Sequence, residues 1–254
     1  MCETALSRQF GTAALLRFAL PNIAMMVFLS LYTIVDGIFI SRYVGTLALS
    51  AVNMSYPLNS LEMALGIMLG TGGSAVVAHK MGAGYLEEAR RDFGFLALVA
   101  VCIGLAVCLA GALFAGPLAR LLGASDLLLD DTVTYLRVQL CFAPMAMLQL
   151  LFESFFVTAE KPHLGFYFTV AAGCTNMVLD VLMVGIWGWG VEGAAIATFI
   201  SQLVGGVLPV FYFIDRSNSS RLHLCKTSFY SKVLRDACIN GSSELMTNLS
   251  MSLV

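Results

Sequence analysis

Four carboxylates lie within long apolar stretches of this 254-residue chain: Asp36, Glu62, Glu153 and Asp180. An ionised side chain at the centre of a bilayer costs at least about 2.5–3.5 kcal/mol, so such groups are functional candidates. The sequence offers none of the four a lysine or arginine at a similar depth. Acids placed in this way predict a site for something positive: a proton, a sodium ion or a cationic organic molecule.

Asp36 and Asp180 each follow a polar residue by four positions, Tyr32 and Asn176 respectively. Residues four apart project from the same face of a helix. The amide of Asn176 can donate to an ionised carboxylate and accept from a protonated one. We therefore predict that both acids bind and release a coupling cation. Two alternatives stay open: Asp36 reaches water near a helix end, or Asp180 is a polar clamp between helices.

Two further features support this prediction. Glu153 follows Gln149 by one turn, and the pair is expected to line the same cavity. Pro21 precedes Asp36 by about four turns and should kink their shared helix, which would suit a moving part. The sequence does not indicate a role for Glu62, or for Glu244 in the last segment.

The elements that position these residues are transmembrane helices. Hydrophobic residues make up 59% of the chain and charged residues 12%, against roughly 25% charged in a soluble domain. A bilayer core needs about 20 apolar residues of helix, and six segments qualify. They are Leu15–Ile40, Ser50–Ala78, Asp92–Ala115, Tyr135–Thr158, Leu164–Ile186 and Gly193–Ile214. The predicted fold class is all-α, a polytopic membrane helical bundle with six transmembrane helices and the start of a seventh.

The distribution of lysine and arginine predicts the orientation. With a cytoplasmic N-terminus, 11 of the 14 basic residues fall in the segments on the cytoplasmic side, as the positive-inside rule requires. They are Arg8, Arg17, Lys80, Arg90, Arg91, Lys161, Arg216, Arg221, Lys226, Lys232 and Arg235. We expect a multi-pass protein of the cell membrane.

Residues 1–214 are predicted to form a six-helix lobe, 215–232 a cytoplasmic linker, and 233–254 the start of a second lobe. A shift of 218 positions places Leu234-Arg235 on Leu16-Arg17 and Asn240 on Asn22, a weak internal repeat. Parallel repeats of this kind occur in transporters. We expect the sequence to be the first half of a longer protein, with a C-terminal lobe as its partner. A natural half-length chain that dimerises is the alternative.

Other classes of function find no support in the sequence. The seven cysteines and three histidines have neither metal-site nor disulfide spacing, and no enzyme signature is present. The net charge of −2 argues against nucleic acid as a partner. The run GIMLGTGGS at 66–74 lacks the ending of a phosphate-binding loop, so its glycines are expected to pack helices closely.

The stretches LLRFALPNIAMMVFLSLYTIVDGIFISRYVG, GTGGSAVVAHKMGAGYLEEARR and TNMVLD resemble the multidrug and toxic compound extrusion (MATE) family. The resemblance extends over essentially the whole chain. It implies twelve spans in two six-helix lobes around a central cavity. Members expel organic cations and other amphipathic compounds against an inward flow of protons or sodium. The resemblance therefore implies a secondary active efflux transporter of drug-like molecules, with no cofactor beyond the coupling ion.

By this resemblance, Asp36 and Asp180 are the coupling acids of the lobe, and Pro21 is where the first helix bends. The resemblance also implies polar positions around the two acids. These are Asn176, Thr198, Tyr32 and Tyr135. Glu153 is a departure, because similar proteins carry an uncharged amide there, and this leaves the drug preference and the choice of ion open.

Two other functions remain to be weighed. One is a flippase for lipid-linked sugars, whose phosphates would need cations in the cavity; the shortage of lysine and arginine in the spans argues against it. The other is a non-transporting membrane scaffold or fragment, since one lobe does not enclose a cavity alone.

Overall fold

The computed structural model describes residues 12–39, 42–43, 45–215, 220–225, 227 and 230–253. This part of the chain is helical and contains no strand. The α-helices are α1 (Thr12–Phe39), α2 (Thr46–Gly82), α3 (Leu86–Leu121), α4 (Leu129–Cys141), α5 (Ala143–Thr158), α6 (Pro162–Asp180), α7 (Gly190–Ile214) and α8 (Ser231–Leu253). A π-helix, η3 (Val181–Ile186), directly continues α6. The predicted all-α membrane fold is confirmed.

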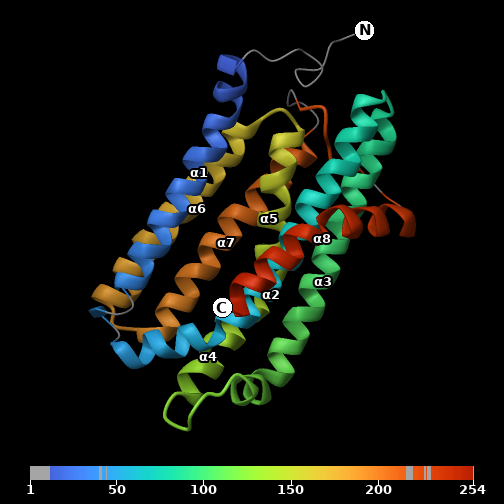
Figure 1. The fold of residues 1–254 in the computed structure, drawn as a ribbon. Helices are drawn as coiled ribbons and strands as arrows, with labels where there is room; N and C mark the ends of the chain where they lie inside the picture. The colour runs from blue at the N-terminus through green and yellow to red at the C-terminus, as the bar shows by residue number, and fades with distance from the viewer. Residues whose placement is uncertain are drawn as a thin grey trace.

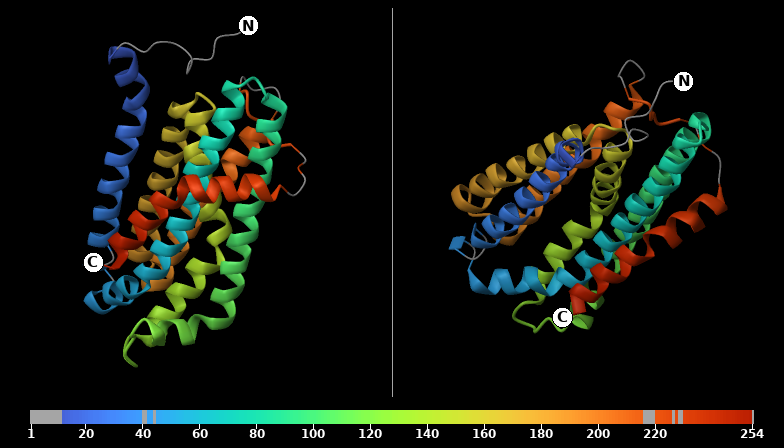
Figure 2. Two further views of the ribbon diagram at one scale, coloured as in Figure 1. Left: turned by 45° about the vertical axis from the view of Figure 1, so that its right-hand side comes forward. Right: turned by 45° about the horizontal axis from the view of Figure 1, so that its top comes forward.

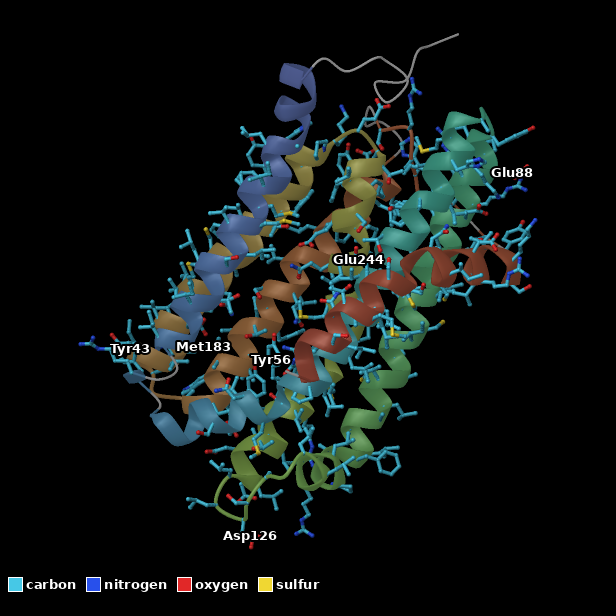
Figure 3. All side chains as sticks on the ribbon, viewed as in Figure 1. Tyr43, Tyr56, Glu88, Asp126, Met183 and Glu244 are labelled. Carbon is cyan, nitrogen blue, oxygen red and sulfur yellow. The ribbon has the colours of Figure 1, made fainter. Side chains whose placement is uncertain are left out.

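The long helices run up and down in one bundle, and α8 lies across it at a steep angle (Figures 1 and 2). Figure 3 shows Glu88, after the turn between α2 and α3, at one end of the bundle and Asp126 at the other. The end marked by Glu88 also carries Lys80, Arg90 and Arg91, and we call it the basic end. We call the end marked by Asp126 the acidic end.

The described residues contain four helical segments that are long and apolar enough to cross a membrane: Ser50–Gly82, Leu86–Leu121, Pro162–Ile186 and Gly190–Ile214. Along α3, Leu98, Leu105, Leu109 and Leu113 are more than half exposed. Their spacing places them on one side of the helix. An exposed apolar stripe of this length is what a lipid-facing helix requires.

The fourth predicted span is wrong as a single continuous helix. It is divided at Phe142 into α4 and α5, which meet at an angle of 55° and together count as one further span. Pro144 stands near the start of α5. Proline disfavours the helical conformation of the residue before it and supplies no N–H to the preceding turn, so the helix breaks here.

Aromatic side chains hold α3, α5 and α7 together near the basic end. The ring of Phe93 on α3 lies 4.6 Å from that of Phe155 and 4.9 Å from that of Phe213 between centroids. Phe152 and Phe156 on α5 also contact Phe213 on α7. Each such pair adds about 0.5–1.5 kcal/mol beyond the area that it buries. The three helices are therefore tightly packed against one another at this end of the bundle.

Glycines bring α2 and α3 close to the broken helix. A Cβ atom at Gly66 would lie 2.7 Å from Leu150, and one at Gly70 would lie 2.9 Å from Ser154. On α3, a Cβ atom at Gly104 would lie 2.5 Å from the Cα atom of Pro144. The prediction that the glycines at 66–74 serve close helix packing is confirmed.

Candidate functional site

The buried face of α6 carries three polar residues. Thr169, Asn176 and Asp180 are 3%, 0% and 1% exposed, and they lie on the side of the helix that also buries Gly165, Ala172 and Gly173. Seven residues separate Thr169 from Asn176, which is about 10 Å along the axis. The face is therefore a polar stripe through the packed interior of the lobe.

The stripe meets α7 at Thr198. The amide nitrogen of Asn176 donates a hydrogen bond to the Thr198 Oγ1 atom at 3.4 Å, and that hydroxyl donates to the carbonyl oxygen of Ala194 at 3.0 Å. Asp180 lies one turn beyond Asn176 on the same face. The structure thus brings Asn176 and Thr198 into contact, with Asp180 adjacent in the stripe.

Helix α4 completes this region. Tyr135 is buried and packs against Val191 and Ala195 of α7. Tyr135 and Thr198 also line one narrow crevice, together with Gln139 on α4 and Gln202 on α7. Within the described part of the chain, the Oε1 atom of buried Gln139 has no hydrogen-bond partner. A buried acceptor in this position is available to a bound molecule or water.

Sequence reasoning missed both glutamines. Gln139 follows Tyr135 by four residues, and Gln202 follows Thr198 by four, so the one-turn spacing was available as a signal. A carboxylate stands out in an apolar segment because its charge is costly in a membrane, whereas a neutral amide gives a weaker signal.

Directly after Asp180, the backbone changes from α- to π-helix. The N–H of Trp187 donates to the carbonyl oxygen of Leu182 at 2.8 Å, the five-residue spacing of a π-turn. Such segments are rare and occur frequently at functional sites. Gly188 and Gly190 then adopt φ values of 66° and 61°, which favour glycine, in the turn into α7.

The side chains of Pro21, Tyr32 and Asp36 lie outside the described part of the chain, but their helix is placed beside α6 (Figure 1). Thr169 Oγ1 lies 3.4 Å from the sulfur of Met25 on α1. A Cβ atom at Gly173 would lie 2.5 Å from the ring of Phe28. The two helices therefore run in parallel with an offset of about 144 residues. This register places the backbone of Asp36 level with Asp180.

Glu153 on α5 contacts this polar stripe at Thr169, nearer the basic end. Its Oε1 atom accepts a hydrogen bond from Thr169 at 3.1 Å, and the amide of Gln149 donates to the same carboxylate. Gln149 in turn lies against Gly205 of α7. The structure brings Glu153 and Gln149 together in one crevice, two turns of α6 away from Asn176.

Glu62 on α2 is another buried acid, 4% exposed. In the part of the chain that the structure describes, neither of its carboxylate oxygens has a hydrogen-bond partner. One turn earlier, Leu58 packs on Leu136 and Leu140; one turn later, Gly66 meets Leu150. Glu62 therefore lies level with the break between α4 and α5, apart from the stripe on α6.

A sequence model of the MatE family matches residues 21–182. The chain belongs to the MatE family. The multidrug export protein MepA of Staphylococcus aureus strain MRSA252 is 26% identical over 205 residues, which are 81% of this chain and 46% of MepA. MepA of Staphylococcus saprophyticus is 26% identical over 208 residues, 80% of this chain and 45% of that protein.

Solved structures of MATE proteins share the fold. A MATE protein in complex with MaD3S is 25% identical with a TM-score of 0.86, covering 94% of this chain and 54% of that one. An inward-facing MATE transporter is 25% identical with a TM-score of 0.81 and covers 88% and 51%. An outward-facing structure, 24% identical, has a TM-score of 0.86 and covers 94% and 53%.

The MatE family is a family of transporters, not of enzymes. The chain spans about half the length of the curated relatives it matches. The matched residues include Pro21, Tyr32, Asp36, Asn176 and Asp180. Thr198 lies beyond them, joined to the matched region by its hydrogen bond with Asn176.

Proposed function

We propose that this chain is the N-terminal lobe of a secondary active transporter that exports organic cations or amphipathic drug-like molecules in exchange for protons or sodium ions. One observation supports the proposal most: the register of α1 on α6 sets Asp36 level with buried Asp180, where Asn176 and Thr198 are hydrogen-bonded. Two acids at one depth, in a family of transporters, suit the capture of a travelling cation.

The proposed mechanism is alternating access. A cation enters from outside and neutralises Asp36 and Asp180, which lowers the cost of burying them. The first helix then rearranges against α6, the cavity changes shape, and the cargo leaves outward. The ion leaves to the cytoplasm during the reset. We place the basic end in the cytoplasm, with the N-terminus, because it carries Lys80, Arg90 and Arg91.

The choice of ion is tested by imposing each gradient separately. The full-length protein in proteoliposomes is loaded with ethidium, and efflux is followed under a proton gradient alone, a sodium gradient alone, and neither. We expect one of the two gradients to make ethidium efflux faster than it is without a gradient. Equal rates in all three conditions would contradict ion-coupled transport.

Glu153 is expected to tune the choice of cargo. A Glu153→Gln variant keeps an acceptor for Thr169, so we expect its stability to change by no more than about 1 kcal/mol. Removing one negative charge should lower transport of divalent relative to monovalent organic cations by about tenfold, the effect of about 1.4 kcal/mol. The measurement is the ratio of the two efflux rates, with Glu160→Gln as the control. An unchanged ratio would show that Glu153 does not face the cargo.

A further inference from the structure

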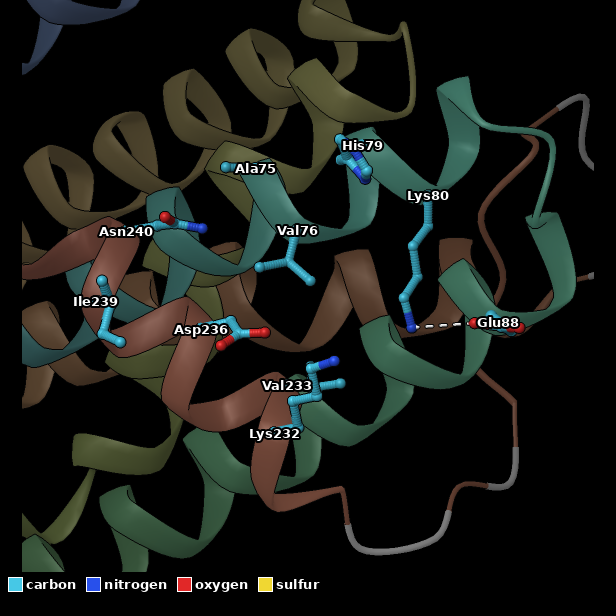
Figure 4. A pocket seen from close by; sticks show the side chains of 10 residues that line it. All are labelled: Ala75, Val76, His79, Lys80, Glu88, Lys232, Val233, Asp236, Ile239 and Asn240. Atoms are coloured by element: carbon cyan, nitrogen blue, oxygen red, sulfur yellow. Dashed lines mark ion pairs between the residues drawn. The ribbon is translucent and has the colours of Figure 1, made fainter.

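Glu62 on α2 is a buried acid that the proposed coupling pair does not include. Two other acids of the interior have partners. Buried Asp92 lies 2.6 Å from the Lys80 ammonium, which also pairs with Glu88 at 3.2 Å (Figure 4). Glu153 accepts two hydrogen bonds from side chains. Both carboxylate oxygens of Glu62 are shielded from solvent, and within the described residues neither has a hydrogen-bond partner. A buried group of this kind requires an explanation, and an ion is one of them.

Helix α2 runs alongside the broken helix in a steady register. Leu58 packs against a cluster that includes Leu140, and a Cβ atom at Gly66 would meet the side chain of Leu150. Residues four apart lie on one face of a helix, so Glu62, midway between the two, faces the broken helix as well. This register sets Glu62 level with the start of α5.

The end of α4 leaves two backbone carbonyl groups at this level without their usual helical donors. Pro144 has no N–H to donate to the carbonyl oxygen of Leu140. The N–H of Met145, which would reach Cys141 in a continuous helix, donates to Phe142 at 2.9 Å. The carbonyl end of a helix carries partial negative charge, which favours a cation and disfavours an ionised acid. Discontinuous membrane helices bind cations at such ends.

The break is buried, and the helices around it supply no lysine, arginine or histidine. Ala143 is 0% exposed, and a Cβ atom at Gly104 of α3 would lie 2.5 Å from the Cα atom of Pro144. Residues 50–78, 92–119, 138–160, 193–214 and 236–253 contain none of these three residue types. The ionisable side chains that flank the break are two thiols, an exposed arginine, a glutamate bound by Thr169 and an exposed glutamate: Cys108, Cys141, Arg137, Glu153 and Glu244.

We propose that Glu62 and the carbonyl end of α4 form a second site in this lobe for a hard monovalent cation, a proton or a sodium ion. Oxygen donors suit either ion, and the bound ion neutralises the acid and joins α2 to the broken helix. The site is separate from the pair Asp36 and Asp180, which lies where α1 meets α6. Both sites can therefore be occupied at once, and binding at Glu62 does not require ion-driven efflux.

The test compares Glu62→Gln with its parent, a full-length protein that carries Asp36→Asn and Asp180→Asn so that the proposed coupling pair does not contribute. The proton arm is infrared difference spectroscopy between acid and alkaline pH, which detects the carbonyl stretch of a protonated carboxyl group. The sodium arm is binding of radioactive sodium at constant pH. We expect Glu62→Gln to lose part of the carboxyl band or the bound sodium. The matched control is Glu192→Gln, an exposed acid on α7, which should keep the signal of the parent.

Glu62→Asp keeps a carboxyl group and is measured alongside in case Glu62→Gln does not fold. It should retain the signal, with its carboxyl band shifted in frequency because the shorter side chain meets different neighbours. A loss in the proton arm assigns a proton to the site, and a loss in the sodium arm assigns sodium. Identical signals in the parent, Glu62→Gln and Glu62→Asp would overturn the site. A signal that depends on Glu62 in a protein without ion-driven efflux would keep the site and reject the antiport.

Discussion

Replacing Asp180 with asparagine in the full-length transporter is expected to reduce ion-driven efflux at least about 100-fold, to the rate of empty liposomes. The variant keeps the size of the side chain and removes its charge, so the site no longer distinguishes an ion-loaded from an empty state. The charge is worth about 2.5–3.5 kcal/mol in a membrane, which corresponds to a factor of about 100. Asp36→Asn should have the same effect, because both acids are needed in the proposed cycle.

The measurement is ethidium efflux from proteoliposomes under the driving gradient, with the amount of inserted protein determined in each preparation. Asp126→Asn is the control, since this exposed acid lies at the acidic end of the bundle (Figure 3). It should retain the efflux of the unmodified protein. Normal efflux in both Asp36→Asn and Asp180→Asn would refute the coupling role.

The second large effect concerns the packing of the broken helix. Gly104→Leu should prevent α3 from seating against Pro144, because even a Cβ atom there would lie 2.5 Å from the Cα atom of that residue. We expect a loss of at least about 3 kcal/mol, the upper range for overpacking a core. Thermal unfolding of the purified protein in detergent measures this loss.

Gly116→Leu on the same helix is the matched control, because a Cβ atom there meets nothing within 4 Å. A leucine at that position should leave the unfolding temperature nearly unchanged, since leucine is favourable in lipid. If the Gly104 and Gly116 variants were equally stable, the close contact between α3 and the start of α5 would not be present in the purified protein.

The helices could be predicted from the sequence because a span requires about 20 apolar residues, and their number and order leave few alternatives. The break at Phe142 was missed although Pro144 stood in the segment, because proline is common in membrane helices that stay continuous. The π-helix after Asp180 was also missed. The residues that form it, such as Val181 and Leu182, are apolar and give no local sign of it.

The candidate site was predicted unevenly for a similar reason. Carboxylates in apolar stretches are conspicuous, so Asp180 and Glu153 could be selected from the sequence alone. Gln139 and Gln202 needed the structure, which sets α4 beside α7. The ion pair of Lys80 with Asp92 joins two helices across a turn, and the sequence had suggested only that Asp92 opens a span; α3 in fact begins at Leu86.

The most direct test of the coupling site measures binding without transport. The affinity of purified full-length protein for ethidium is determined by fluorescence anisotropy over a series of proton and sodium concentrations. If cargo and ion compete for the same acids, the affinity should fall as the coupling ion increases, and this dependence should vanish in Asp36→Asn/Asp180→Asn. A double variant whose affinity follows the ion concentration as the unmodified protein does would contradict the assignment of these two acids.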